Sequence, residues 1–512
     1  MPPYVRMTLT ASRRVLQQLS LILAGLFALV WAIVRARVQS ITLDEADTYF
    51  WFVAKPGVGI FYPYANNHIL NTLLIWLTTH AFGLSTIAVR TPALLGALLY
   101  ILTCYFLCRN ITDRFSLQFP VFICLIYNPL ISDFMVAARG YSLADAFLLA
   151  AIAIPVSHRV NGAPSLDKCC ALASLALGLS FTANFSFAFV DLAVFLAVVT
   201  WTVRRRGGES ATRIVGLCAL PGLFVALLVA GPLLIHWKRE DLFYGARSLA
   251  EMTRSLIDGS LYRLSPGPWY KLMHSMAPFL IPALGILCAC QLVVTRMNAR
   301  ARWLAKFAAA LAFVLAFSLL LHWLAFRLDG ILLPMSRTGI FLLPLCTLLA
   351  AVIAAMPATS VLSLWLRRAI TAAFVCLACH FLLSLRLTYF KEYEYDADVK
   401  DVYIVLEQLK RNYGVTDVAA HGTYLSSLNF YRVASPNDGF PEFTPVMDDN
   451  PVSKTINVLE GTYEKGFIER DGLAVIYQGE STGVVIAVRP GGPIPPLRID
   501  REILLRRRKA AR

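Results

Sequence analysis

The chain has 512 residues, of which 57% are hydrophobic and 15% are charged, and its formal net charge is +15 at pH 7. Soluble domains average roughly 45–50% apolar and about 25% charged residues, so this composition excludes an ordinary soluble protein and indicates a lipid bilayer as the surroundings. The basic residues lie in short loops between apolar segments, which excludes the nucleic-acid partner that the charge would otherwise indicate.

Basic residues at the N-terminus precede the first apolar segment, residues 19–34, as they would in a secretory signal peptide. The segment is longer than a signal sequence requires and no small-residue cleavage site follows it, so we expect a retained membrane anchor. Ten further segments have the apolar character of membrane spans. They cover residues 88–107, 117–131, 143–156, 169–182, 187–203, 214–235, 276–294, 304–324, 340–356 and 369–387.

Two assignments in this series depend on more than apolarity. Residues 169–203 are too long for one span at 1.5 Å per residue, and Asn184 and Ser186 offer a turn, so we expect a helical hairpin there. Residues 69–82 form a short segment with an asparagine and a histidine, which favours a helix on the membrane surface. About 11 transmembrane helices result.

The charges along the chain predict its orientation. Alternate loops contain 17 lysine and arginine residues and only three acidic residues. By the positive-inside rule, these loops and the N-terminus face the cytoplasm of a plasma (inner) membrane protein. Residues 35–88, residues 236–275 and everything from residue 388 onward then face the extracytoplasmic, or periplasmic, side.

We expect three regions: a polytopic transmembrane domain at 1–388, a small extracytoplasmic α/β domain at 389–490, and a Pro/Gly linker with a basic tail at 491–512. Apolar residues at helical spacing from Val402 to Leu409 indicate a helix in the second region. The segments VTDVAAH, LNFYRV, LAVIYQG and VVIAVRP have the composition of strands. The predicted fold class is an α-helical polytopic membrane protein with a small α/β C-terminal domain.

An acidic pair, Asp44 and Glu45, follows the first span by some ten residues. A carboxylate near the low dielectric of lipid has a raised basicity, so one of the pair could act as general base toward the hydroxyl of an acceptor. The alternative is structural, with Asp44 capping the first turn of a short helix. The sequence leaves both open and does not decide which acid would be the base.

A second polar group lies at the outer junction of the third and fourth predicted spans, where Arg139, Tyr141 and Asp145 occur close together. A charge inside an apolar helix, such as Asp145, is costly and indicates a functional site or an ion pair with Arg139 that fixes helix packing. Arg90 and Arg337 begin two other spans on the same face. Three arginines on one face predict a pocket for a phosphate or pyrophosphate, although snorkelling anchors have the same pattern.

Two further patterns bear on metal binding. The histidines are scattered without metal-ligand spacing, so the sequence predicts no metal site and leaves a divalent-metal requirement open. Asp396 and Asp398 form an Asp-x-Asp pattern, which we interpret as the cap of the following amphipathic helix.

The order of these motifs resembles that of the GT-C glycosyltransferases of the protein mannosyltransferase and aminoarabinose transferase type. The sequence is thus similar to glycosyltransferase family 39. The matching segments are LDEADTYF, HAFGLSTIAVRTP, ARGYSLADAF and LPMSRTGIFLLPLCTLL. The His-Pro-Pro element common in relatives is replaced here by Asn66, Asn67 and His68.

This resemblance implies the transfer, with inversion, of a sugar from a polyprenyl-phosphate-linked donor to an extracytoplasmic acceptor, which is a lipid, glycan or protein. It implies that Asp44 is the base and that Glu45 orients it or binds substrate. Cations can neutralise a phosphate leaving group in place of a general acid, with Arg139, Arg337 and Lys55 as candidates. The remaining candidates for substrate binding are Asp145, Tyr141, Arg90 and His68.

A polytopic transporter or flippase of a lipid-linked or small polar substrate is the alternative, because the intramembrane residues Asp145 and Asp191 could belong to a proton or substrate path. Transporters usually contain internal repeats, which the sequence lacks, and they do not need a long acidic and aromatic external loop. We therefore favour the enzyme. The sugar, the acceptor, the lipid carrier and the oligomeric state are not determined by the sequence.

Overall fold

The computed structural model describes the chain except for residues 1–2, 56, 58, 163–164, 207–210, 237, 263–264, 266, 295–298, 359, 447–453 and 500–512. The predicted basic tail therefore falls mostly outside the described residues. The chain forms two compact units. The first consists of Met1–Val34, Pro56–Ile75 and Arg90–Leu385, and the second of Arg35–Lys55, Trp76–Val89 and Arg386–Arg512.

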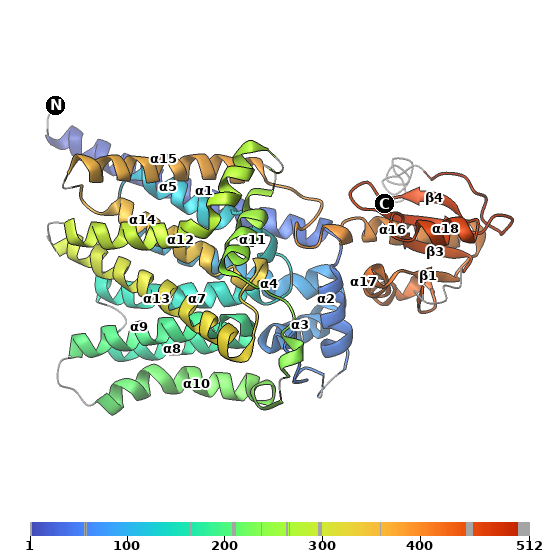
Figure 1. The fold of residues 1–512 in the computed structure, drawn as a ribbon, viewed down its shortest axis with the longest axis horizontal. Helices are drawn as coiled ribbons and strands as arrows, with labels where there is room; N and C mark the ends of the chain where they lie inside the picture. The colour runs from blue at the N-terminus through green and yellow to red at the C-terminus, as the bar shows by residue number, and fades with distance from the viewer. Residues whose placement is uncertain are drawn as a thin grey trace. The chain divides into compact units, whose positions relative to one another are not determined.

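The first unit is a bundle of long helices that lie side by side (Figure 1). Within it, α8 packs against α7 and α10, and α5 packs against α14 and α15. The helices that belong to this unit wholly or in part are α1 (Pro3–Val38), α3 (Ile69–Phe82), α4 (Thr86–Ile111), α5 (Phe115–Tyr127), α6 (Pro129–Phe134), α7 (Tyr141–Asn161), α8 (Leu166–Ala183), α9 (Ala188–Arg206), α10 (Ala211–His236), α11 (Leu249–Leu261), α12 (Pro268–Val294), α13 (Ala299–Asp329), α14 (Leu342–Ala355) and α15 (Val361–Leu383).

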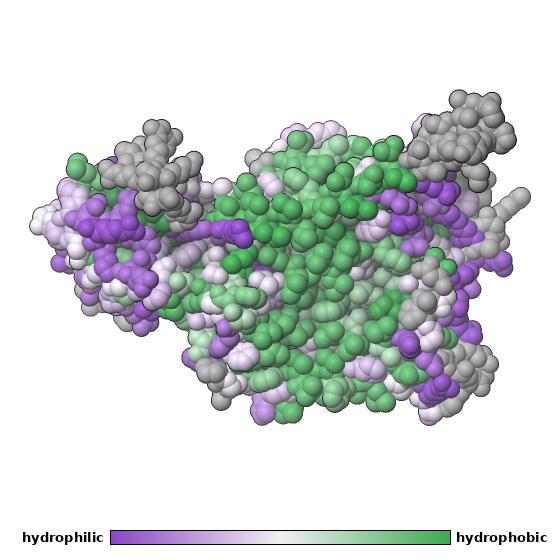
Figure 2. Space-filling view, turned by 180° about the vertical axis from the view of Figure 1, so that it is seen from behind, coloured by the Kyte–Doolittle hydropathy of each residue, from purple (hydrophilic) through white to green (hydrophobic). Residues whose placement is uncertain are grey.

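Among the described residues, ten helices are long and apolar enough to cross a membrane, and they correspond to ten of the eleven predicted spans. Large apolar side chains are exposed on them, for example Leu220, Phe224 and Leu228 on α10. Figure 2 shows one face of the helical unit covered by hydrophobic residues. Such a surface is compatible with lipid and not with water, so the chain is a multi-pass membrane protein of the predicted fold class.

One predicted span, residues 117–131, has no counterpart among these ten helices. It corresponds to the 13-residue helix α5 followed by the short helix α6. Asn128 separates the two, because its side-chain oxygen accepts hydrogen bonds from the backbone N–H groups of Leu130 and Ile131, at 3.0 and 3.4 Å. Pro129 occupies the first turn of α6, where a missing N–H costs nothing. At about 20 Å, α5 is shorter than a hydrocarbon core of about 30 Å.

The predicted hairpin is confirmed. Helix α8 ends at Ala183 with Asn184 as its C-cap, and α9 begins after the single 3-10 turn η2 (Phe185–Phe187). Asn184 leaves the helical region, and its side-chain oxygen accepts hydrogen bonds from the N–H and the hydroxyl of Ser186, at 3.0 and 2.7 Å. The two residues that the sequence indicates therefore form the turn.

The predicted surface helix over residues 69–82 is α3, a separate helix of 14 residues. Its length, about 21 Å, is too short to cross a bilayer of ordinary thickness. Its position at the membrane surface stays a prediction.

The C-terminal part of the second unit contains a five-stranded sheet with the strand order β2-β1-β3-β5-β4. The first strand is parallel to β2 and β3, whereas β5 is antiparallel to β3 and β4. Helices accompany the sheet (Figure 1). The elements are α16 (Val399–Tyr413), β1 (Val418–Ala420), α17 (Gly422–Ala434), β2 (Thr444–Pro445), β3 (Ile456–Glu460), α18 (Lys465–Arg470), β4 (Ala474–Gln478) and β5 (Val484–Val488).

The sequence predicts α16, β1, β4 and β5 correctly, but the strand predicted for LNFYRV is wrong, because this segment belongs to α17. Among the buried residues of α17, Tyr424, Leu428 and Tyr431 recur at intervals of four and three, which is helical spacing, although Ser427, Asn429 and Phe430 are buried as well. The aromatic and β-branched composition of the segment conceals that period. The buried strand β3, which joins β1 to β5, is absent from the sequence prediction.

The interpretation of Asp398 as a helix cap needs correction. Asp398 directly precedes α16 but makes no side-chain capping bond. Its Oδ2 atom accepts hydrogen bonds from the backbone N–H of Ser481 at 2.8 Å and from the N–H and hydroxyl of Thr482 at 2.8 and 3.0 Å. Asp398 therefore fixes the turn between β4 and β5.

Candidate functional site

The acidic motif lies on the short helix α2 (Leu43–Thr48) in the second unit. Thr42 is its N-cap: Thr42 Oγ1 accepts from the N–H of Glu45 at 3.2 Å, and the Glu45 carboxylate accepts from the N–H of Thr42 at 2.9 Å. This capping box satisfies two N–H groups that the first turn leaves without partners. The alternative in which Asp44 caps this helix is therefore wrong, because Thr42 and the fully buried Glu45 do so.

Asp44 has a different environment from Glu45. Its side chain is half-buried, and its Oδ2 atom accepts a hydrogen bond from the hydroxyl of Tyr393 at 2.8 Å. Tyr393 follows the last long helix and belongs to the same unit as Asp44. Lys55 is exposed, two residues after the π-helical turn η1 (Tyr49–Val53).

The first unit contains a polar cluster, the Arg139 cluster, which consists of the buried residues His68, Asn71, Arg139 and Asn184 and the partly buried Asn66. The Arg139 guanidinium donates to the side-chain and main-chain oxygens of Asn66. Asn71 Nδ2 donates to the carbonyl of Ala138 at 2.9 Å, and Asn184 Nδ2 donates to the carbonyl of Arg139 at 3.2 Å. Three asparagines thus fix the backbone and the side chain of one arginine.

The protonation of His68 follows from its neighbours. Asn184 Nδ2 lies 3.4 Å from His68 Nε2, and the Asn184 oxygen already accepts from Ser186, so Nε2 is the acceptor and the ring proton is on Nδ1. Burial lowers the pKa of His68 well below its ordinary value, and the positive charges of Arg139 and Arg337 lower it further. His68 is therefore a neutral imidazole at physiological pH.

His68 Nδ1 is buried and has no hydrogen-bond partner among the residues that the structure describes. A buried N–H without an acceptor is costly, and such groups are rare unless a ligand or water satisfies them. Together with the guanidinium of Arg139, this N–H can bind an anion such as a phosphate oxygen.

Arg337 belongs to the same electrostatic environment, because its charge acts on His68. Its guanidinium lies over the ring of Tyr244, 4.5 Å from the centroid. The preceding residue, Ser336, has a φ of +45°, and its N–H donates to the hydroxyl of Ser255 at 2.8 Å. A left-handed conformation is uncommon outside glycine, and here the hydrogen bond to Ser255 supports it.

Tyr141 and Asp145 begin α7, directly after Arg139 and Gly140. The Tyr141 ring meets the rings of His68 and Phe134 edge to face, with centroids 5.8 and 4.7 Å apart. Tyr141 therefore forms one wall of the Arg139 cluster.

Asp145 lies one turn further along α7, and its Oδ1 atom has no hydrogen-bond partner among the described residues. No ion pair joins Asp145 to Arg139 within the described residues, so the structure does not support the alternative in which such a pair fixes helix packing. Both carboxylate oxygens of Asp191, on α9, likewise have no hydrogen-bond partner within the described part of the chain. Arg90 is fully buried near the start of α4.

Gly140 explains how α7 and α8 approach each other beside this cluster. Its φ is +75°, and a Cβ at this position would lie 2.0 Å from the carbonyl oxygen of Ala183, the last residue of α8. Only glycine permits both the dihedral angle and the close approach. This contact sets the direction in which Arg139 and Tyr141 leave the backbone.

The structure brings His68, Arg139 and Tyr141 together in the first unit, and it shows the asparagines that orient them, which the sequence prediction does not assign to the site. The signals for these asparagines are the polar pair before His68 and the hairpin turn at Asn184. No signal in the sequence connects Tyr393 with the acidic motif.

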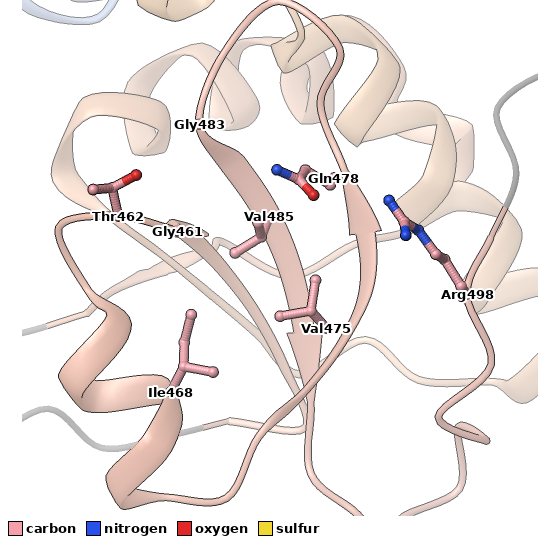
Figure 3. A pocket seen from close by; sticks show the side chains of 8 residues that line it. All are labelled: Gly461, Thr462, Ile468, Val475, Gln478, Gly483, Val485 and Arg498. Carbon is pink, nitrogen blue, oxygen red and sulfur yellow. The ribbon is translucent and has the colours of Figure 1, made fainter.

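The C-terminal sheet carries a hollow of about 410 Å³, which Figure 3 shows with Thr462 and Ile468 on one side and Arg498 on the other. Arg498 is the single titratable residue in its lining, so the hollow offers no general acid or base. The lining residues are Gly461, Thr462, Ile468, Val475, Gln478, Gly483, Val485 and Arg498.

The described residues contain no group of three or more histidine, cysteine, aspartate or glutamate side chains that could hold a metal ion.

Comparisons with known proteins give structural similarities only. No protein-family model matches the sequence, and no curated protein matches it. The fold is similar to that of ArnT from Cupriavidus metallidurans bound to undecaprenyl phosphate, with 11% identity, 93% of this chain and 99% of that chain covered, and a TM-score of 0.48.

The same protein in its apo state gives 12% identity, coverage of 94% and 98%, and a TM-score of 0.41. The mycobacterial arabinofuranosyltransferase AftD gives 15% identity over 78% of this chain and 29% of that chain, with a TM-score of 0.40. These similarities are too weak to indicate the function of this chain.

Proposed function

We propose that the chain is a GT-C type glycosyltransferase that transfers a sugar from a polyprenyl-phosphate carrier to an extracytoplasmic acceptor, with inversion at the anomeric carbon. The observation that carries the proposal is the Arg139 cluster, in which a guanidinium and a neutral imidazole N–H are buried at the end of a membrane helix. Buried donors of this kind favour a ligand with phosphate oxygens. The order of motifs in the sequence supports the same reading.

In the proposed reaction, Asp44 removes the proton from the acceptor hydroxyl. The acceptor oxygen then bonds to the anomeric carbon from the face opposite the phosphate, and the bond between that carbon and the phosphate oxygen breaks. The electron pair leaves with polyprenyl phosphate, whose charge Arg139 and Arg337 neutralise. A general acid is not required, because a phosphate leaves as a stable anion.

The other expected residues receive narrower roles. Glu45 holds the first turn of α2 through the capping box, so we propose that it supports Asp44 and does not exchange protons itself. Tyr141 bounds the space beside His68. For Asp145, Arg90 and Lys55 we retain the proposal of substrate binding, which rests on the resemblance in sequence.

We also propose that the N-terminus is cytoplasmic and that the acidic motif and the C-terminal domain are extracytoplasmic. The distribution of basic residues among the loops supports this orientation. Cysteine labelling of residues introduced at exposed positions, such as Lys55 and Arg213, tests it: a membrane-impermeant maleimide should label the first position in intact cells and the second only after lysis.

A test of the reaction uses purified protein in lipid nanodiscs, a panel of polyprenyl-phosphate sugars and an extract of cell-envelope acceptors. Wild type should release polyprenyl phosphate, whereas Asp44→Asn should reduce turnover by about 100-fold or more. Asp47→Asn, a substitution of the same kind on the same helix, is the matched control and should retain activity. Equal turnover in Asp44→Asn and wild type would remove Asp44 as the base.

A transporter or flippase is the second candidate, because Asp145 and Asp191 are buried in membrane helices with carboxylate oxygens that have no hydrogen-bond partner among the described residues. Such groups occur in proton and substrate paths. Proteoliposomes discriminate between the two functions. Movement of a labelled polyprenyl-phosphate sugar between leaflets, without release of the sugar, would favour the transporter.

A further inference from the structure

The segment between α15 and α16 makes several hydrogen bonds to the loop that carries the acidic motif, and both belong to the second unit. The carbonyl of Tyr389 accepts hydrogen bonds from the side chains of Arg35 and Gln39, at 3.3 and 2.9 Å. The guanidinium of Arg35 also lies 5.3 Å from the centroid of the Phe390 ring. These contacts fix the end of α1, from which the acidic loop begins.

A second group of contacts fixes the residues just before Asp44. The hydroxyl of Ser40 donates to the carbonyl of Ala397 at 2.7 Å, and the N–H of Ile41 donates to the hydroxyl of Tyr431 at 2.8 Å. The N–H of Leu43 donates to Asp396 Oδ2, also at 2.8 Å. The backbone from 40 to 43 is therefore held by side-chain and main-chain atoms of the C-terminal region.

Asp44 itself receives its hydrogen bond from Tyr393 within this framework. Tyr393 is 1% exposed, and its ring meets those of Phe390 and Tyr395 edge to face, at 6.4 and 6.2 Å. Because the ring is enclosed, the hydroxyl has little freedom to move away from Asp44 Oδ2. A phenol hydroxyl that donates to a carboxylate stabilises the ionised form of that carboxylate and restricts its rotation.

We infer that Tyr393 is a positioning residue for Asp44: its hydrogen bond to Oδ2 restricts the rotation of the carboxylate and holds Asp44 in the orientation in which it acts on the acceptor hydroxyl. This inference rests on the proposed function, because it assumes that Asp44 is the base. It assigns the C-terminal domain a part in catalysis through Asp44, in addition to any binding by the domain itself.

The need for such support follows from the charges around Asp44. Glu45 and Asp47 lie on the same helix, and Asp396 faces it from the C-terminal segment. The pKa of Asp396 lies well above its ordinary value, mainly because of burial and further because of the carboxylates of Asp44, Glu45 and Asp47. Negative neighbours disfavour ionisation of any one member, so the donor from Tyr393 acts in the opposite direction.

The test compares Tyr393→Phe with wild type in the turnover assay, because this change removes one hydroxyl and keeps the enclosed ring. We expect kcat to fall about 10-fold, with KM for the lipid donor changed by less than about threefold, since orientation and ionisation of the base act on the chemical step. The acidic limb of the pH–rate profile should move to higher pH, because the substitution removes a hydroxyl that favours the ionised carboxylate.

Tyr403→Phe is the matched control. Tyr403 is also a buried tyrosine of the second unit, and its hydroxyl donates to Asp438 at 3.0 Å, so the substitution removes a similar tyrosine–aspartate bond that does not involve Asp44. Its effect on thermal stability should match that of Tyr393→Phe, and its pH–rate profile should match that of wild type. Equal profiles and equal kcat for Tyr393→Phe and wild type would overturn the inference.

The double variant Asp44→Asn with Tyr393→Phe separates this inference from the proposed function. If Tyr393 acts through Asp44, the double variant should be no slower than Asp44→Asn alone. If Asp44→Asn is inactive while Tyr393→Phe behaves as wild type, the base assignment stands and the positioning role fails. If Asp44→Asn retains full turnover, both fail.

Discussion

Replacing Gly140 with alanine should damage the protein more than any other single added methyl group near the Arg139 cluster. The φ of Gly140 is +75°, a conformation that costs an alanine about 1 kcal/mol or somewhat more. The added Cβ would also lie 2.0 Å from the carbonyl oxygen of Ala183, a main-chain atom that cannot move without shifting the end of α8. Overpacking of this kind adds about 1–3 kcal/mol, for a total of roughly 2–4 kcal/mol.

Gly162 provides a control that isolates the dihedral contribution. Its φ is +71°, but apart from its chain neighbours no described residue has a heavy atom within 4 Å of a Cβ built there, so Gly162→Ala should cost only about 1 kcal/mol. Thermal unfolding of both variants in the same detergent, followed by intrinsic tryptophan fluorescence, measures the difference. Gly140→Ala should lower the melting temperature at least about twice as much as Gly162→Ala, and should also reduce donor turnover. Equal shifts would refute the close contact between α7 and α8.

Three other outcomes follow from the site. Because the pKa of His68 is lowered, the folded protein binds a proton there less readily than the unfolded chain, so the free energy of unfolding should fall as the pH decreases below ~6.5. In His68→Asn this fall should be smaller. Melting temperatures between pH 7.5 and 5 measure the effect, and identical slopes in the two proteins would count against it. Glu45→Ala should cost about 1 kcal/mol through loss of the capping box with Thr42, measured by thermal unfolding, whereas an unchanged midpoint would contradict that role. Arg139→Lys should reduce donor turnover about 10-fold or more although the charge is kept, because Nη2 of the guanidinium donates to Asn66 and a lysine, with a single nitrogen, cannot bind Asn66 and also offer a phosphate the planar donors of a guanidinium; full activity would argue against recognition by the guanidinium.

The sequence predicts the membrane helices well because hydrocarbon imposes one strong requirement, about 20 apolar residues per span, that local composition reveals. The hairpin at Asn184 is predictable for a related reason, since an apolar stretch twice that length must turn. The prediction of secondary structure fails where capping residues or aromatic composition conflict with the apolar pattern. Asn128 and Pro129 shorten α5 through capping, and the aromatic composition of α17 conceals its helical period.

The candidate site likewise contains residues that the sequence reveals and contacts that it does not. Arg139, Tyr141 and His68 are recognisable because charged and polar groups are rare near apolar helices. The contact between Asp44 and Tyr393 joins residues 349 positions apart, and neither residue has a local pattern that indicates the other. The N-cap of α2 is also not predicted correctly, because the sequence indicates Asp44 whereas the structure shows Thr42, and both residue types cap helices. Only the folded geometry distinguishes them.

The long separation between the acidic loop and its supports has a consequence for synthesis at the ribosome. Residues 40–44 emerge early, but the partners that fix them, from Tyr389 to Tyr431, are made roughly 350 residues later. At typical elongation rates of about 5–20 residues per second, the loop would wait roughly 20–70 s before it could reach its final conformation. A chain that terminates anywhere before residue 389 would insert its helices and still lack the contacts that order the acidic motif, so the completion of translation itself would determine when the motif becomes ordered.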